Sequence, residues 1–417
     1  MIRFPYGVPA LFVLLVALPA RASVPPLLVP PHRDSVTVSS PEAPLLAPGR
    51  TTLADTTHKS RAQLALEQRT LGHALERQGA PVAAIAAYRI AVQLDPTIPL
   101  AHYRMGRLFS AVGQHAAALK EYAAETLHHP DDRDARRWLG LELAQTGDTA
   151  RANALLESMV RRDPKDGASW RALGFAYSTA GRASQGEAAL RQAIQLDAND
   201  AEAWRDLGVV LGAGRRDDEA RKAYERAVQL DPADAGSYVN LGNLERRNQR
   251  YPAALAAYHA AEQRDSTLAL GWRGEVEVLK QMQRGAEAGE VFRRWLATQP
   301  DNLSLRDEAM DHFIAIGRPD VALELGRDGV RRLPRSGETH LALGMAYRAD
   351  HELRAALAEL RRSEALFSHP EQRARVATAI GALRAEAPDS LRAFFAADSV
   401  AHEGPAPADT AAARLRR

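Results

Sequence analysis

Cysteine is absent from the 417-residue sequence, which excludes disulfide bonds, thiolate metal sites, cysteine catalysis and the lipid-attachment cysteine of a lipoprotein leader. Aromatic residues are also scarce, at 6% of the chain. Hydrophobic residues still reach 46% and charged residues 25%, so the chain can bury a core. A core built mainly from small side chains favours closely packed helices.

An excess of charge of one sign is also absent. The net charge is +2, and Arg3 and Arg21 in the first 22 residues account for it, so the remainder is neutral. A neutral chain has no global reason to bind nucleic acid or an anionic membrane, and we expect neither as a partner. Only five of the 54 basic residues are lysine, so arginine is the default cation of this sequence.

The sequence also lacks the short motifs of common catalytic sites. It contains no phosphate loop, glycine-rich dinucleotide turn, G-x-S-x-G elbow or H-E-x-x-H pair. The adjacent pair His128-His129 precedes Asp131 and Asp132, but neighbouring side chains on a helix diverge by about 100°. We therefore expect a solvated loop there, and no metal, cofactor, catalytic residue or enzyme activity in this chain.

The first 22 residues predict an export signal. Arg3 is followed by an apolar run from Ala10 to Leu18, and Ala20-Arg21-Ala22 fits a cleavage site. The run is about half of the ~20 residues that a spanning helix needs. We expect cleavage after Ala22 and a periplasmic or secreted protein with no integral membrane span; the alternative is an inner-membrane anchor at the N-terminus. Residues 23–60, rich in Pro, Ser and Thr, are predicted to be a disordered spacer, and residues 401–417 a disordered tail.

A 34-residue pattern then repeats nine times, from residue 65 to 370, without insertion or deletion. The repeats begin at residues 65, 99, 133, 167, 201, 235, 269, 303 and 337. Position 8 is glycine in seven repeats, from Gly72 to Gly344, and position 20 is alanine or glycine in all nine. Position 32 is proline in six. A fixed period of this length indicates a stack of similar structural units.

Each repeated position has a physical role in a pair of helices. Positions 4, 7, 8 and 11 share one face of a first helix, and positions 20, 24 and 27 share one face of a second. Glycine at position 15, as in Gly113, suits a turn that needs positive φ, and pairs such as Asp231-Pro232 end the second helix. Val276 and Met310 replace the glycine at position 8 in repeats seven and eight, so we expect local irregularity there.

This pattern resembles the tetratricopeptide repeat, and the resemblance covers about three quarters of the chain. It implies an all-α solenoid over residues 61–370, in which nine helix–turn–helix repeats form a right-handed superhelix with an inner groove. Capping helices are expected over residues 371–400, one near 372–385 and a shorter one near 390–397.

The resemblance also implies where a ligand would lie, because positions 2, 5, 9 and 12 of the first helix line the groove in that family. Position 5 is arginine in five repeats, and two further arginines lie nearby in repeat two: Arg69, Arg137, Arg171, Arg205 and Arg273, with Arg104 and Arg107. Asn240 and Asn243 resemble family amides that hold a peptide backbone. An arginine pairs bidentately with a carboxylate, so these residues predict binding of an extended, acidic protein segment. A solvated helix face in an arginine-rich chain would look the same.

The later repeats reverse the sign of this surface, through Glu277, Asp307, Glu308 and Asp311. The groove should therefore be positive early and negative late, which would orient a ligand. The leading hypothesis is an exported, non-enzymatic scaffold that binds a protein or peptide segment, within a cell-envelope assembly or secretion complex. The alternatives are an accessory subunit of an envelope polysaccharide or glycosyl-transfer machine, and a self-assembling structural element.

Overall fold

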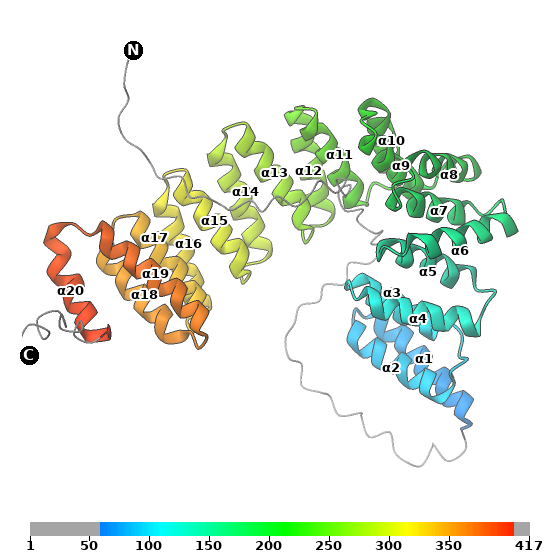
Figure 1. Cartoon of the computed structure of the whole chain (residues 1–417), viewed down its shortest axis with the longest axis horizontal. Helices are drawn as coiled ribbons and strands as arrows, with labels where there is room; N and C mark the ends of the chain where they lie inside the picture. Colours follow the sequence, from blue (N-terminus) through cyan, green and yellow to red (C-terminus); the bar gives the residue numbers. More distant parts are fainter. Residues whose placement is uncertain (1–58, 404–417) are drawn as a thin grey trace, which may run out of the picture. The chain divides into compact units, whose positions relative to one another are not determined.

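The computed structural model describes residues 59–403, which contain 20 helices and no strand (Figure 1). The helices are α1 (Arg61–Arg77), α2 (Pro81–Leu94), α3 (Ala101–Ala111), α4 (His115–His128), α5 (Arg133–Gln145), α6 (Thr149–Arg162), α7 (Gly167–Thr179), α8 (Ala183–Leu196), α9 (Ala201–Ala213), α10 (Asp217–Leu230), α11 (Ala235–Arg247), α12 (Tyr251–Arg264), α13 (Ala269–Gln281), α14 (Gly285–Thr298), α15 (Leu303–Ala315), α16 (Pro319–Arg332), α17 (Gly337–Ala349), α18 (Leu353–Leu366), α19 (Pro370–Glu386) and α20 (Asp389–Glu403). The expected signal, nearly all of the spacer and most of the tail lie outside the described residues.

The first 18 helices form nine pairs, which confirms the all-α repeat architecture expected from the sequence. Apart from α1, the first helix of every pair begins within two residues of a predicted repeat start. Polar side chains fix several of these starts: Asp132, Asp166 and Asn302 each accept a hydrogen bond from a backbone N–H three residues on. The helices of repeats seven and eight, α13 to α16, are uninterrupted despite the loss of the position 8 glycine.

The turn inside each repeat has the same backbone conformation at position 15. Gly79, Gly113, Gly147, Gly181 and Gly317 adopt φ between 72° and 90°, which confirms the need for positive φ. In the other four repeats the same conformation is carried by non-glycine residues with φ between 58° and 61°, namely Arg215, Gln249, Gln283 and His351. The turn is therefore imposed by the helix pair, and glycine is the residue that adopts it with least strain.

The glycine at position 8 leaves room for a large side chain on the second helix. In repeat six, a Cβ atom added to Gly242 would lie 2.7 Å from the ring of Tyr258, a distance that real Cβ contacts do not reach. Gly72 and Gly208 meet Tyr88 and Tyr224 in the same way. Each of these tyrosines is at position 24 and is buried. The repeated glycine thus accommodates a ring or leucine from the paired helix.

The contacts divide the described chain into two compact units. One contains the described residues up to 192 together with 209–216, and the other contains residues 193–208 and those from 217 onward. At the end of the second unit, α19 buries Val376, Ile380 and Leu383, which pack with Leu360 of α18 and Phe395 of α20. No helix in the described part of the chain is long and apolar enough to span a bilayer.

Helix α20 continues to Glu403, so it includes the first three residues of the segment expected as the tail, 401–417. Ala401, His402 and Glu403 are all compatible with a helix, and the first strong helix breakers in the sequence are Gly404 and Pro405. The sequence therefore allows the helix to run up to these breakers.

Candidate functional site

Two pockets open on the side of the second unit where the first helices of successive repeats lie next to one another. The first, of about 460 Å³, is formed by α11, α13 and α15 and is lined by Asn243, Arg246, Leu270, Arg273, Gly274, Val276, Glu277, Lys280 and Glu308. Six of these residues are at positions 2, 5, 9 or 12 of repeats six and seven. The pocket therefore lies on the face that the resemblance implied for a ligand.

Two residues expected from the sequence, Asn243 and Arg273, come together in this first pocket. The Asn243 side-chain oxygen accepts a hydrogen bond of 2.7 Å from the Tyr258 hydroxyl, which fixes the carboxamide and leaves its NH2 group available. The Arg273 side chain is 61% exposed and lies 3.3 Å from Glu308. Its guanidinium stands over the Trp295 ring, 6.0 Å from the ring centre. An exposed ion pair of this kind is weak, so Arg273 can exchange Glu308 for a ligand carboxylate at little cost.

The second pocket, of about 360 Å³, lies between α15, α17 and α19. Its lining residues are Asp307, Met310, Asp311, Ile314, Glu338, Leu341, Ala342, Met345, Arg348, Arg375, Thr378, Ala379 and Ala382. Most of them continue the same positions 2, 5, 9 and 12, and the register extends through the capping helix α19 as if a tenth repeat began at residue 371. The sequence pattern already contained this signal, since the 34-residue frame continues into the capping segment without a break.

The electrostatics of the second pocket centre on Asp307. Burial raises the pKa of this carboxyl to about 6, and the negative charges of Glu338 and Asp311 act in the same direction. Arg375 and Arg306 lower it, but by less. Asp307 therefore lies in a site that disfavours its charged form unless a further cation is present.

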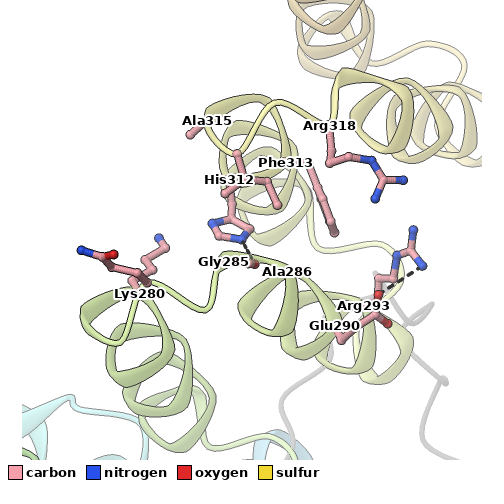
Figure 2. A pocket seen from close by; sticks show the side chains of 11 residues that line it. Lys280, Gly285, Ala286, Glu290, Arg293, His312, Phe313, Ala315 and Arg318 are labelled. Carbon is pink, nitrogen blue, oxygen red and sulfur yellow. Dashed lines mark hydrogen bonds and ion pairs between the residues drawn. The ribbon is translucent and has the colours of Figure 1, made fainter.

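A third depression, of about 720 Å³, lies at the edge of the repeats, where the turns following α13 and α15 approach α14 (Figure 2). His312 is buried beneath it and hydrogen-bonds the Gly285 carbonyl oxygen through Nε2 at 2.9 Å. Burial lowers the pKa of this imidazole, so it is neutral at pH 7. Arg293 is paired with Glu290 and Arg318 with Asp320, and the Lys280 ammonium stands 5.6 Å from the centre of the Phe292 ring, so each lining cation already has a partner within the fold.

The early arginines are largely engaged in contacts between neighbouring helices. Arg104 lies 3.3 Å from Glu76, and the Arg107 guanidinium stands 5.8 Å from the centre of the Trp138 ring. Arg137 is ion-paired with Asp134 and lies 3.7 Å from Asp166.

The remaining predicted residues differ in their exposure. Arg69, Arg171 and Asn240 are half-buried on α1, α7 and α11. Position 5 was expected to face solvent, but Arg205 is buried, with only 3% of its surface exposed. Its Nη1 donates to Asp234 at 3.0 Å, and Asp206 lies 3.5 Å away. Arg205 is therefore a structural cation inside the second unit, and a ligand could reach it only by breaking those ion pairs.

One group of side chains has the composition of a metal site. Ligand atoms of His259, Glu262 and Glu275 lie within 4.8 Å of one another. The Arg294 guanidinium already occupies their centre, 2.7 Å from Glu275 and 3.3 Å from both Glu262 and His259. Burial, and then the neighbouring Glu275, raise the pKa of Glu262. This arrangement is explained by an internal ion network whose cation is Arg294.

The His128-His129 pair makes ordinary contacts in the turn after α4. The exposed His128 ring stacks on His102, with 6.1 Å between ring centres. His129 Nε2 lies 3.0 Å from the Thr97 carbonyl oxygen. The two rings thus take part in different contacts, as expected for neighbours that diverge along a helix.

Family profiles described as tetratricopeptide repeat match residues 103–167 and 239–302, residues 143–208, and residues 201–234. A search of the curated proteins finds no match.

Several solved structures are similar to this chain. TTC0263, a thermophilic TPR protein of Thermus thermophilus, is 21% identical, with a TM-score of 0.41, over 43% of this chain and 97% of that chain. MamA from residue 41 of Desulfovibrio magneticus is 20% identical, with a TM-score of 0.35, over 41% of this chain and 96% of that one. The Cut9–Hcn1 hetero-tetramer of APC/C gives 12% identity and a TM-score of 0.40, over 77% of each chain.

Proposed function

We propose that this chain binds a segment of a partner protein on the face formed by the first helix of each repeat. The chain belongs to the tetratricopeptide-repeat family, whose members generally serve as non-enzymatic scaffolds for protein–protein interaction. The segment lies across positions 2, 5, 9 and 12 of successive repeats. The protein acts outside the cytoplasm, in an envelope assembly or secretion complex, and catalyses no reaction itself.

The observation that carries this proposal is the pocket between α11, α13 and α15. Its lining combines charged and apolar side chains: Arg273 and Leu270 are exposed, and Val276 is buried. Asn243 is held by Tyr258 and can donate to a peptide carbonyl, and Arg273 can pair with an acidic side chain. A protein segment with both a backbone to be held and a carboxylate to be paired fits these groups, whereas most early arginines are already used inside the fold.

The export part of the proposal is supported by the sequence of residues 1–22, with its apolar run and small residues before a cleavage site. Fractionation of cells producing the full chain with a C-terminal tag tests it. The tagged protein should be found in the periplasm or medium and should have lost the mass of 22 residues. Retention of the whole chain in the cytoplasm would contradict export without affecting the binding proposal.

Photo-crosslinking tests the binding face directly. A benzoylphenylalanine placed at Leu270, inside the first pocket, should capture a distinct set of partner proteins from envelope extract. The matched control is the same amino acid at Glu324, an exposed position on the second helix α16. Combining the Leu270 probe with Arg273→Glu should remove the captured species while circular dichroism stays unchanged.

Equal capture from both positions would show that contact is non-specific and would overturn the proposed face. Capture at Leu270 that survives Arg273→Glu would keep the face and remove the carboxylate pairing. These variants avoid Arg205, because reversing that buried charge would unfold the protein and give a false loss of binding.

A further inference from the structure

The pocket between α15, α17 and α19 combines an apolar floor with an acidic rim. Met310 and Leu341 are almost fully buried, and Ile314 and Met345 are half-buried beside them. Methionine side chains are flexible and polarizable, so two of them can adapt to the shape of an inserted apolar group. Five of the 13 lining residues are charged here, against five of nine in the first pocket, so a larger share of this lining is uncharged.

The charges on the rim do not balance. Arg375 is 3.2 Å from Glu338, and Arg348 holds Glu386 at 2.8 Å, so both lining arginines are already paired. Asp307 and Asp311 form no ion pair with any residue that the structure describes. The pocket therefore presents two carboxylates that lack an ion pair within the described residues, one helical turn apart on α15.

We propose that this pocket binds a segment of a partner protein in which a lysine or arginine is adjacent to a large apolar residue. The cationic group pairs with Asp307 and Asp311, and the apolar side chain enters between Met310, Leu341 and Met345. This inference rests on the proposed function and adds the chemistry of the ligand at this end of the repeats. The ligand charge inferred here is positive, whereas the early arginines predict a negatively charged ligand.

Three features favour such a segment over other ligands. Burial of Asp307 disfavours its charge, so a cation delivered by a ligand removes an existing penalty. An anionic ligand would be repelled by the same carboxylates. Adjacent helices pack about 8–10 Å apart, so the three helices span about 20 Å, which matches about six residues of extended chain at ~3.3 Å each.

Methionine methyl spectra of the full chain give a local readout. The sequence has six methionines, of which Met310 and Met345 line the pocket, whereas Met105, Met159 and Met282 do not. With 13C-methyl methionine, titration with an acetylated, amidated Ala-Leu-Arg-Leu-Ala peptide should shift the Met310 and Met345 signals and leave the other three in place. Replacing the arginine of the peptide by citrulline should weaken binding about tenfold, and replacing its leucines by serine should abolish the shifts.

The protein variants separate charge from fold. Asp307→Asn/Asp311→Asn should weaken peptide binding about tenfold or more, whereas Asp301→Asn/Glu324→Gln, which removes two exposed carboxylates elsewhere, should change it less than twofold. Equal binding by Asp307→Asn/Asp311→Asn, or equal binding of a peptide with glutamate in place of arginine, would overturn the proposal. If the peptide fails while Leu270 still crosslinks partners through Arg273, this inference falls and the proposed function stands; if both fail, both fall.

Discussion

Met310 lies over Gly326, with its terminal methyl group 3.0 Å from the place where a Cβ on Gly326 would stand. Met310 is at position 8 of repeat eight and Gly326 at position 24, so the usual small and large partners have exchanged helices. Repeat nine shows the common arrangement, with Gly344 against Leu360. The exchange explains why α15 and α16 are uninterrupted although the glycine signature lapses.

The exchange predicts a coupled pair of substitutions. Gly326→Leu should destabilise the protein by about 1–3 kcal/mol, because the new side chain overlaps both Met310 and Leu343, each of which has an atom 3.0 Å from the place of the added Cβ. The double variant Met310→Gly/Gly326→Leu removes the overlap with Met310 but keeps the one with Leu343, so it should recover only part of the loss, about 0.5–1 kcal/mol relative to the sum of the single changes. Urea unfolding followed by circular dichroism measures this coupling. Strictly additive effects would show that the two side chains do not share one space.

The turn at position 15 offers a stabilising substitution. Gln249 adopts φ of 59°, a conformation that costs a non-glycine residue about 1–2 kcal/mol. Glycine relieves this strain but gives the unfolded chain more conformational entropy, which offsets part of the gain. Gln249→Gly should therefore raise the free energy of unfolding by about 0.5–1 kcal/mol. The reverse change at the same place in repeat two, Gly113→Ala with φ of 72°, should lower it. A Cβ on Gly113 would point into open space, so the thermal midpoint of that variant reports backbone strain alone. If Gln249→Gly lowered stability, the contacts made by the glutamine side chain would outweigh the backbone strain that glycine relieves.

Arg205 provides a prediction that separates a structural arginine from an exposed one. Arg205→Ala should cost about 3–5 kcal/mol, because it leaves Asp206 buried and Asp234 without its cation. Arg133→Ala removes an arginine that is 66% exposed and should change stability by less than about 1 kcal/mol. The midpoints of urea unfolding for the two variants test this. Similar midpoints would show that the Arg205 ion pairs contribute little.

Much of the fold could be predicted because its signals are local and repeated. The period of 34 located the helix pairs, and glycine at position 15 located the left-handed turns. The sequence placed position 8 on one face of the first helix and position 24 on one face of the second. Only the structure shows that the large residue at position 24, such as Tyr258, fills the space beside the glycine. The exchange in repeat eight could not be predicted from Met310 alone, because its meaning depends on Gly326 in the paired helix.

The candidate site was harder to predict, because exposure and charge pairing depend on neighbouring repeats. Arg205 and Arg273 occupy the same position of the repeat. Arg205 is nevertheless buried and paired with two carboxylates, whereas Arg273 is exposed beside Glu308. The sequence did indicate the change of sign at Asp307 and Asp311. It could not indicate that Arg375 and Arg348 are already paired, since their partners lie 37 and 38 residues away along the chain.

The raised pKa of Asp307 predicts how stability changes with pH. Its pKa of about 6 exceeds the ordinary value of 3.8, so between these values the folded state holds a proton that the unfolded state has released. Stability from this group is therefore complete below about pH 4 and declines as pH rises through 6. Asp307→Asn, which cannot ionise, should be more stable than the parent by about 1–3 kcal/mol at about pH 7.5 and by almost nothing at about pH 4. Urea midpoints at the two pH values measure this, with Asp301→Asn as the exposed control. If the stability difference between the two proteins stayed constant with pH, Asp307 would have its ordinary pKa in the folded state. If the parent gained stability relative to Asp307→Asn as the pH rose, folding would lower the pKa of Asp307 instead of raising it.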